Sequence, residues 1–596
     1  MSQASDLART ALARGDLITA YDVTTAAIAE GDPGGTIRHQ QVLALARMGD
    51  TERATSLFAA YGLDGSNDPH ERAIGARLLK DRALAAAPGP ERQEALARAH
   101  EAYLAIYRDS GDSFPGINAA TLALLAGDEA QAQALALALL DDPAVAAAPD
   151  YYKAATRAEA LLLLGRTGEV TETLASEAIR GSGDYGGRSS TLRQLSMVAA
   201  CLGMDEKARA ALLAPLCPPR VAHYCGHMFG ADAPAEAPIR AALEALLDEE
   251  EIGFAYGALA CGADIIAAEA LLDRGVELHV VLPFEEQDFL LQSVRPGGPG
   301  WETRYRACRD RAASLVYASP MAFFGNPAQY GYASRTAMGL ARLRAEHLGA
   351  QAVQIAIWDG VASDGPAGTG ADVASWTAAG ERTRIVDPGD VARSLERPEP
   401  RVTTPYERAL AAILFTDFKG FSTLSEAALP SFWDGVMRVV AEVLDAHAAE
   451  VECRNSWGDA LYAVTSSAPV AAEIALQLQD RLARFDYATL GLDGSGGMRI
   501  GAHYGPAYRT TDHITGRITY YGTEVSKAAR IEPVTPPGAV FVTEPFAAIL
   551  ALEARGRFTC RYVGRIALAK KYGDYPMYRL SRAEAKPTGI AADLLI

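Results

Sequence analysis

The feature that most constrains the fold is a short glycine–acid signature that recurs through the first third of the chain. It reads Gly15-Asp16, Gly49-Asp50, Gly127-Asp128, Gly168-Glu169 and, with one residue inserted, Gly203-Met204-Asp205. The stretches between these sites are rich in alanine and leucine, with apolar residues at helical spacing. A glycine in this place ends one helix through a left-handed cap, and the acid then caps the next helix. The signature therefore predicts a series of helix-turn-helix units.

The spacing of the signature is close to that of a known repeat. Gly49 follows Gly15 by 34 residues and Gly203 follows Gly168 by 35. Gly127 and Gly168 lie 41 apart, and the 78 residues from Gly49 to Gly127 have room for two drifted units. Units of about 34 residues resemble tetratricopeptide repeats, which stack into a solenoid. The resemblance implies an α-helical repeat scaffold that binds a protein partner or senses a signal; an α-helical bundle with accidental spacing is the alternative.

The helical pattern ends near residue 215, and a different one occupies residues 216–385. Short apolar runs bounded by glycine and proline alternate there with helical stretches, which predicts βαβ units and a parallel sheet. The expected strands are 221–224, 252–256, 278–282, 314–318 and 353–358, and a helix is expected at 265–274.

A glycine-rich turn follows the second expected strand, from Gly257 into Gly262-Ala263-Asp264. Glycines allow a tight turn, and the helix N-terminus behind them offers N–H groups to an anion. The turn is similar to a motif of the Rossmann-like SLOG superfamily, although Ala258 replaces the first glycine of that motif. The resemblance implies a nucleotide-like ligand at Gly257, Gly262 and Asp264. The alternative is that these glycines serve only helix–strand packing.

His223, Cys225 and His227 alternate along the first expected strand and would share one face. They are possible ligands of a metal ion, but no fourth ligand is placed. A strand that leads into a buried loop explains them as well, and we favour that interpretation.

The final third carries five ordered motifs, after a proline-containing linker at 386–405. An apolar run ends in Asp417-Phe418, and about 40 residues later Gly458-Asp459 lies in the hairpin of a second strand pair. Two carboxylates from adjacent strand ends suit a two-ion Mg²⁺ site that binds a triphosphate. The other motifs follow at 498–506, 518–532 and 537–543.

Together these motifs are similar to the catalytic domain of class III adenylate/guanylate cyclases, over residues 406–582, with a C-terminal tail at 583–596. The resemblance implies an α+β, ferredoxin-like domain that acts as a homodimer with its sites at the interface. It implies conversion of ATP to 3′,5′-cyclic AMP and pyrophosphate, with two Mg²⁺ or Mn²⁺ ions per site. The metal ligands would be Asp417, Asp459 and the backbone carbonyl of Phe418.

The same resemblance assigns roles to basic residues near the C-terminal end. Arg530 matches the arginine that stabilises the charge developing on the phosphate. Lys570 or Lys571 matches the lysine that holds the terminal phosphates, and the sequence does not decide between the two.

Three positions depart from the family pattern. Asn455 stands where adenylate cyclases usually have a base-reading lysine, and Thr519 where they usually have an aspartate. Ser526 replaces the asparagine that orients the ribose. Asn455 and Thr519 can still hydrogen-bond a base edge, and Ser526 can still contact the sugar. The alternatives are therefore a cyclase for GTP or a pyrimidine triphosphate, or a degenerate domain that senses nucleotide within an interaction scaffold.

Charge and hydropathy exclude several other classes. The chain has 56 basic and 74 acidic residues, a net charge of −18, which argues against nucleic-acid binding because that needs clustered Lys and Arg. Seven scattered cysteines argue against a secreted disulfide scaffold. The most apolar run, 132–140, is too short to span a bilayer, and residues 1–9 do not resemble a signal peptide. We therefore expect a cytoplasmic signalling enzyme.

Overall fold

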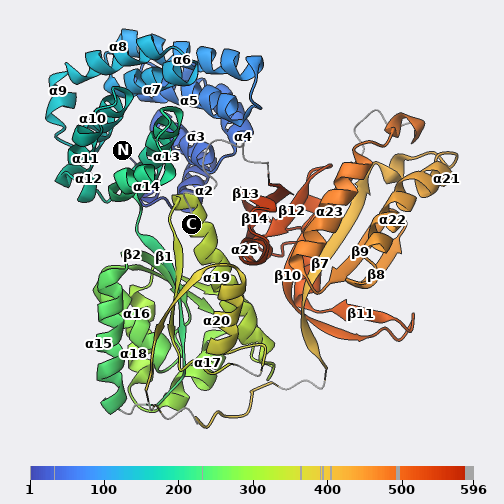
Figure 1. Cartoon of the computed structure of the whole chain (residues 1–596). Coiled ribbons are helices and arrows are strands. Elements are labelled where there is room, and N and C mark those ends of the chain that lie inside the picture. Colours follow the sequence, from blue (N-terminus) through green and yellow to red (C-terminus); the bar gives the residue numbers. More distant parts are fainter. Residues whose placement is uncertain are drawn as a thin grey trace. The chain divides into compact units, whose positions relative to one another are not determined.

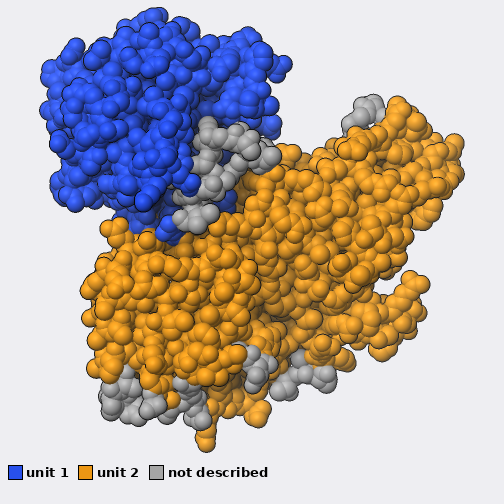
Figure 2. Space-filling view, in the orientation of Figure 1, with its two compact units in different colours: residues 1–219, 346–351, 585–596 blue, residues 220–345, 352–584 orange. Residues whose placement is uncertain are grey.

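The computed structural model describes residues 2–32, 34–230, 233–362, 365–389, 391, 395–402, 406–490 and 497–583. The chain divides into two compact units (Figure 2). Unit 1 takes in residues 1–219 and 346–351, and unit 2 takes in residues 220–345 and 352–584. Of the helices in the described part of the chain, none combines the length and the apolar character that crossing a bilayer requires.

Unit 1 is all helical, and its successive helices pack against one another as an arc (Figure 1). Small buried alanines at the contacts, such as Ala20, Ala54 and Ala132, let the helices approach closely. The helices are α1 (Gln3–Ala13), α2 (Leu17–Ala29), α3 (Gly35–Arg47), α4 (Thr51–Ala60), α5 (Pro69–Ala85), α6 (Pro90–Ser110), α7 (Ser113–Leu125), α8 (Glu129–Leu140), α9 (Pro143–Ala147), α10 (Tyr151–Leu163), α11 (Thr167–Leu174), α12 (Glu177–Arg180), α13 (Tyr185–Cys201) and α14 (Glu206–Leu213).

Four of the five predicted glycine–acid turns have the expected construction. In each, the glycine has a left-handed φ, and the aspartate side chain accepts the backbone N–H three residues further on, inside the next helix. These turns are Gly15-Asp16, Gly49-Asp50, Gly127-Asp128 and Gly203-Met204-Asp205. The interval between the second and third turns contains four helices, α4 to α7, which make two helix pairs, in line with the two drifted units for which the spacing has room.

The prediction is wrong at Gly168. The turn after α10 instead uses Gly165, with a φ of +70°, and Gly168 lies inside α11. Two glycines three residues apart compete for the turn, and Glu169 falls in the first turn of α11, where its charge is favourable near the helix N-terminus. The N-cap residue, Arg166, makes no side-chain cap.

The first part of unit 2 is a six-stranded parallel sheet with helices packed on it. All five predicted strands form, and the strand order across the sheet is β4-β3-β2-β1-β5-β6. Strands β2 to β4 are added on one side of β1, and β5 and β6 on the other, so the order of addition changes sides between β1 and β5, which are themselves parallel. The sixth strand was missed because it lies at the sheet edge, is only partly buried and has three polar residues among its five. The strands are β1 (Arg220–Gly226), β2 (Ile252–Gly257), β3 (Glu277–Leu282), β4 (Ser314–Tyr317), β5 (Ala352–Ile357) and β6 (Arg382–Val386). The helices are α15 (Ala233–Glu249), α16 (Ala263–Asp273), α17 (Glu286–Phe289), α18 (Trp301–Arg311), α19 (Ala328–Leu348) and α20 (Thr369–Ala378).

Apart from Val386, which ends β6, the segment predicted as a linker forms neither helix nor strand where the structure describes it. It lies against the parallel-sheet region, since Gln292 donates to the Pro398 carbonyl at 3.0 Å and Arg401 lies 3.1 Å from Asp288. Residues 390, 392–394 and 403–405 of the linker, and 584–596 of the predicted tail, lie outside the described residues.

The second part of unit 2 is a mixed sheet of eight strands, with β7 and β10 at its centre. Its main path runs β13-β14-β12-β10-β7-β9-β8, and β11 pairs with β10. The strands are β7 (Arg408–Lys419), β8 (Val451–Trp457), β9 (Ala460–Thr465), β10 (Gly497–Thr511), β11 (Ile518–Tyr521), β12 (Val540–Thr543), β13 (Phe558–Ala567) and β14 (Asp574–Arg582). The helices are α21 (Leu429–Phe432), α22 (Arg438–Ala446), α23 (Ala468–Leu482), α24 (Thr523–Ala528) and α25 (Glu544–Glu553).

Helix α19 joins the two sheets of unit 2. The buried Tyr332 hydroxyl donates to the backbone carbonyl of Tyr504 at 2.9 Å, and Arg335 donates to the Tyr504 hydroxyl at 3.2 Å. Near the start of the helix, Asn326 donates to the carbonyl of Arg408 at 2.8 Å. These bonds hold α19 against the first residues of β7 and the middle of β10.

The closest approach of α19 to α25 is at Gly339, where an added Cβ would lie 2.1 Å from the Ala548 carbonyl oxygen. We expect Gly339→Ala to force the helices apart and to destabilise unit 2 by about 1–3 kcal/mol. Thermal unfolding should show a lower midpoint. Gly168→Ala is the matched control, because no atom lies within 4 Å of that site in α11 and alanine favours the helix. Equal midpoints for both variants would contradict the close contact.

Candidate active site

Two carboxylates meet where β7 ends beside the start of β9. The antiparallel register pairs Thr416 with Leu461, so Asp417 and Asp459 lie at the same edge of the sheet. Gly458 makes the tight turn before Asp459 with a φ of +62°. Burial and the negative charge of Asp417 raise the pKa of Asp459. The predicted aspartate pair is therefore assembled within one chain.

Phe418 is fixed between these aspartates and the core. Its backbone N–H donates to Asp459 Oδ2 at 3.2 Å, and its buried ring packs on Phe432 and Tyr487. These contacts hold the backbone that connects Phe418 to Asp417 and limit how far the first aspartate can move.

Two charged residues that the sequence analysis missed complete this cluster. Arg499 on β10 faces Asp417 in register and donates to its carboxylate, and its Nε lies 2.8 Å from Glu532 Oε1. Burial, together with the charges of Asp417 and Asp459, raises the pKa of Glu532 to about 7 despite the opposing effect of Arg499. Both residues belong to motifs quoted from the sequence, but their convergence depends on the pairing of β7 with β10.

The chemistry of the cluster fits a hard divalent cation. It offers carboxylate oxygens and a neighbouring backbone carbonyl, the ligand types of Mg²⁺ and Mn²⁺. Repulsion between Asp417 and Asp459 contributes to the raised pKa of Asp459, and a bound cation relieves such repulsion. In the described part of the chain no three His, Cys, Asp or Glu residues gather as a metal site, so a cation here would need further oxygen ligands from substrate or water.

The two residues expected to read the base lie on neighbouring strands. Asn455 is exposed on β8, where its Oδ1 accepts the N–H of Ser456 at 2.9 Å. Thr519 on β11 hydrogen-bonds the thiol of Cys453, which lies two residues before Asn455 and so on the same face of β8. The structure thus brings Asn455 and Thr519 to one patch of the sheet.

Ser526 and Arg530 are positioned by α24. Ser526 lies on its exposed side, and Arg530 follows its last turn with its N–H bonded to the Lys527 carbonyl at 2.9 Å. The other face of α24 is held by a buried charge network. Glu524 Oε2 is 2.7 Å from His503 Nε2 and accepts from Lys527 Nζ at 2.6 Å.

The protonation states in this network follow from its partners. Burial alone would raise the pKa of Glu524, but the hydrogen bond to His503 and the charge of Lys527 lower it to about 2. Burial and Lys527 lower the pKa of His503, so its imidazole is neutral. Because ionised Glu524 only accepts, His503 Nε2 carries the proton, and Nδ1 accepts from the Thr543 hydroxyl at 2.8 Å.

Lys570 and Lys571 form the turn between β13 and β14, both exposed and both with left-handed φ, 61° and 58°. The turn is tied to the start of α24, since the Tyr572 hydroxyl donates to the Thr523 carbonyl at 3.1 Å. The lysines therefore lie on the same side of the domain as α24. Among the described residues, no hydrogen bond or ion pair joins this group to Asp417.

The predicted second ligand site lies at the carboxyl edge of the parallel sheet. Gly262 has a φ of +90°, and a Cβ there would lie 2.7 Å from the backbone N of Phe229. Asp264, near Gly257, is buried, and its Oδ2 accepts the N–H of Ala260 at 3.2 Å; burial raises its pKa to about 7. The carboxyl group of Asp264 thus already takes the backbone N–H of Ala260, a donor of the turn that could otherwise bind an anion. Ligand binding here stays a prediction.

The histidines of the first strand have separate partners. His223 is buried, its Nδ1 accepts from Gln354 Nε2 at 3.1 Å, and burial lowers its pKa to about 3. His227 Nε2 lies 2.9 Å from Asp359 Oδ1, between the ends of β1 and β5. Cys225 is buried on the strand between them.

Two family models match parts of the chain. Residues 404–582 match the adenylate and guanylate cyclase catalytic domain, and residues 13–123 match the Tetratricopeptide Repeats-Sensor, or TPR-S, domain. The chain thus contains a class III cyclase catalytic domain and an N-terminal TPR-S domain, which confirms both resemblances. The resemblance of the middle region to SLOG stays a prediction.

Solved structures similar to the chain are cyclase cores. The adenylyl cyclase CyaB from P. aeruginosa is 16% identical, covering 31% of this chain and 99% of that chain with a TM-score of 0.27. The guanylate cyclase domain of RhGC from Catenaria anguillulae, in complex with GTP, is 18% identical, covering 30% and 100% with a TM-score of 0.26. An adenylate cyclase from Trypanosoma brucei is 22% identical, covering 30% and 90% with a TM-score of 0.27. No curated protein matches the chain.

The buried network under α24 leads to a prediction for stability. Glu524→Gln leaves the Lys527 ammonium buried without its anion, and we expect a loss of about 3–5 kcal/mol at neutral pH. Because the pKa of Glu524 is lowered from 4.5 to about 2, its contribution is present above pH 4.5 and is lost as the pH falls towards 2. Thermal unfolding from pH 7 down to pH 3 measures both effects.

The exposed Glu426 provides the control for this prediction, as Glu426→Gln. It should leave the unfolding midpoint and its pH dependence unchanged. A Glu524→Gln protein as stable as wild type at pH 7 would contradict the assignment of a buried ion pair.

Proposed function

We propose that the chain is a nucleotide cyclase that converts ATP to 3′,5′-cyclic AMP and pyrophosphate. The observation that carries this proposal is the pair of carboxylates, Asp417 and Asp459, at adjacent strand ends of a domain that matches the cyclase family. A charged pair in this position is costly to keep unless it binds a cation.

In the proposed reaction the ribose 3′-hydroxyl loses its proton to water and attacks the α-phosphate in line. A new O–P bond forms, the bond to the β-phosphate breaks, and pyrophosphate leaves. Two divalent ions, when bound, lower the pKa of the hydroxyl and neutralise the phosphates. Asp417, Asp459 and the Phe418 carbonyl would hold them, while Arg499 balances part of the negative charge from the side.

Arg530 is proposed to stabilise the charge that develops on the α-phosphate, and Ser526 to hold the ribose. Lys570 or Lys571 would bind the terminal phosphates. These residues lie around α24, and within the described part of one chain no hydrogen bond or ion pair joins them to the aspartate pair. We therefore propose a homodimer in which one copy supplies the aspartates and the other supplies α24.

The base preference is proposed from Asn455 and Thr519. An amide and a hydroxyl each provide a donor and an acceptor, which suits the N6 donor and N1 acceptor of adenine. Neither carries a charge, so selection against guanine depends on geometry alone. GTP is the second candidate, because the same neutral groups can turn to match its edge.

Input from the other domains is proposed to reach the site through α19. This helix belongs to the parallel-sheet region. Its Tyr332 bonds to the carbonyl of Tyr504, and Asn326, just before the helix, bonds to the carbonyl of Arg408, so both central strands are held. Asp417 is near the far end of one of these strands, β7. A shift of α19 would therefore act on the strands that carry the aspartate and Arg499.

The direct test is incubation of the purified chain with each of the four ribonucleoside triphosphates and Mg²⁺ or Mn²⁺, with products identified by mass spectrometry. We expect cyclic AMP to be the main product, and Asp417→Ala to reduce it by at least about a hundredfold because the metal site is lost. Asp445→Ala is the matched control, since that aspartate is exposed and paired with Arg454. Another cyclic nucleotide as main product would correct the base, and no product from any triphosphate would contradict cyclase activity.

A mixing experiment tests the composite site. Asp417→Ala and Arg530→Ala should each be inactive alone, because each removes a group from both sites of the homodimer. Mixed in equal amounts and allowed to exchange subunits, they should recover about a quarter of wild-type activity, from heterodimers with one intact site. No recovery, despite subunit exchange measured by fluorescence transfer, would mean that each copy uses its own Arg530.

A further inference from the structure

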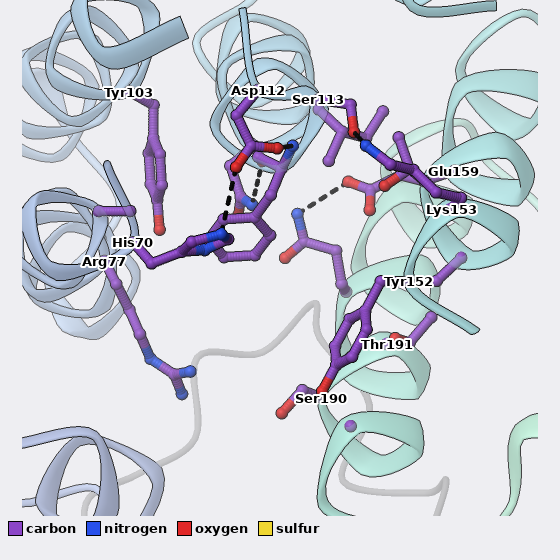
Figure 3. Close-up of a pocket in the computed structure, with 18 of the residues that line it drawn as sticks. His70, Arg77, Tyr103, Asp112, Ser113, Tyr152, Lys153, Glu159, Ser190 and Thr191 are labelled. Carbon is purple, nitrogen blue, oxygen red and sulfur yellow. Dashed lines mark hydrogen bonds and ion pairs between the residues drawn. The ribbon is translucent and has the colours of Figure 1, made fainter. Parts of the chain in front are cut away.

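A large cavity opens among the inner helices of unit 1. Its volume is about 860 Å³, and its lining comes mainly from α3, α5, α7, α10 and α13. Figure 3 shows polar and charged side chains projecting into it from opposite walls, with His70 and Arg77 on one side and Lys153, Tyr152 and Ser190 on the other. A cavity of this size accommodates a drug-sized or nucleotide-sized molecule.

The cavity wall gathers basic residues although the chain as a whole carries a net charge of −18. The basic lining residues are His39, Arg47, His70, Arg77, Lys80 and Lys153. Burial lowers the pKa of Lys80 to about 8. The pKa of nearby Arg193 is lowered to about 10 by burial and by the charges of Arg77 and Arg47. These basic groups therefore repel one another in a partly desolvated site.

The acidic residues that line the cavity already have hydrogen-bond or charge partners. Asp112 and Asp150 accept backbone N–H groups as the N-caps of α7 and α10, and Asp112 also lies 3.3 Å from His70. Glu159 accepts from Thr121 and Gln194, and burial raises its pKa. Much of the negative charge of the lining is thus committed to helix ends and neutral donors. Outside the lining, Asp81 Oδ2 lies 3.4 Å from Arg77 Nε and occupies one of the donors of that guanidinium group.

The two lysines of the lining, Lys80 and Lys153, donate hydrogen bonds to neutral oxygens rather than to carboxylates. Lys80 Nζ donates to Asn118 Oδ1 at 2.8 Å and to Gln194 Oε1 at 3.1 Å. Lys153 Nζ donates to Ser113 Oγ at 2.7 Å. Such partners hold an ammonium group in place without neutralising it, which leaves its charge available to an anion.

Aromatic side chains also line this cavity. Phe114 is 42% exposed and Tyr152 is 61% exposed. The ring of His70 lies 6.1 Å from that of Phe114. A flat ring of a ligand can stack on such side chains while its charged part reaches the basic wall.

We propose that this cavity binds a small organic phosphate of nucleotide size, with its phosphate on Arg77 and Lys80 and its ring against Phe114 or Tyr152. Phosphate oxygens match the arginine and lysine donors, and a sugar matches the hydroxyls of Ser190 and its neighbours. The site lies wholly within unit 1 and is distinct from the candidate active site.

Binding is tested by calorimetry on the full chain carrying Asp417→Ala, in EDTA, so that the cyclase site does not take up metal-bound nucleotide. The probes are 5′-AMP, ADP, adenosine and inorganic phosphate. We expect saturable binding of AMP and ADP and much weaker binding of adenosine. Adding Arg77→Gln or Lys80→Gln should weaken AMP binding by about tenfold or more, because each removes a charge-assisted hydrogen bond.

Two further variants separate a direct contact from a structural effect. Arg98→Gln removes the same charge from α6, where Arg98 is exposed and paired with Glu94, and should leave binding unchanged. Arg77→Lys keeps the charge and should recover part of the affinity. Thermal unfolding confirms that each variant is folded.

Proton uptake provides an independent readout. A bound phosphate raises the pKa of Lys80 from about 8, so binding at pH 8 should take up protons, seen as a dependence of the binding enthalpy on the buffer. Lys80→Gln should reduce this uptake. No saturable binding of AMP or ADP, adenosine binding as tight as AMP, unchanged affinity in folded Arg77→Gln, or binding of an acidic peptide in place of the nucleotides would each overturn the proposal.

Discussion

The candidate active site depends on the pairing of β7 with its two neighbours. Pairing with β9 places Asp459 beside Asp417, and pairing with β10 places Arg499 opposite the same aspartate. The middle of β7 is buried, and its apolar residues fix the register through the core. A slip of one residue would turn Asp417 to the other face and separate the charges. The cluster therefore owes its geometry to hydrophobic packing several residues away.

Much of the fold could be predicted from the sequence because its signals are local. A left-handed glycine followed by a capping aspartate needs only neighbouring residues, and four of five such turns formed as expected. Where two glycines lay close together, at Gly165 and Gly168, the local signal was ambiguous and the prediction was wrong. Strand β6 was missed because an exposed edge strand lacks the apolar run by which the other strands were recognised.

The site was predicted less completely, since charge clusters depend on contacts distant in sequence. Asp417 and Asp459 were found through their place at strand ends, but Glu532 and Arg499 gain their roles only when β10 joins the sheet. The network under α24 and the cavity of unit 1 have the same origin: each collects residues from several elements, and no spacing along the chain records it. In the same way, the motif did not show that the Asp264 carboxyl group accepts the backbone N–H of Ala260 in the glycine-rich turn.

The contacts of α19 have a consequence for how this protein can change over time. Tyr332 and Asn326 both bind main-chain carbonyls, so two of the anchoring bonds require no particular side chain on the strands they meet. Substitutions along β7 and β10 can therefore accumulate without breaking them, whereas Gly339 and Tyr332 on the helix have little freedom to vary. We therefore expect the helix side of the junction to tolerate fewer substitutions than the strand side, so that the cyclase half can diverge in sequence while these two bonds are kept.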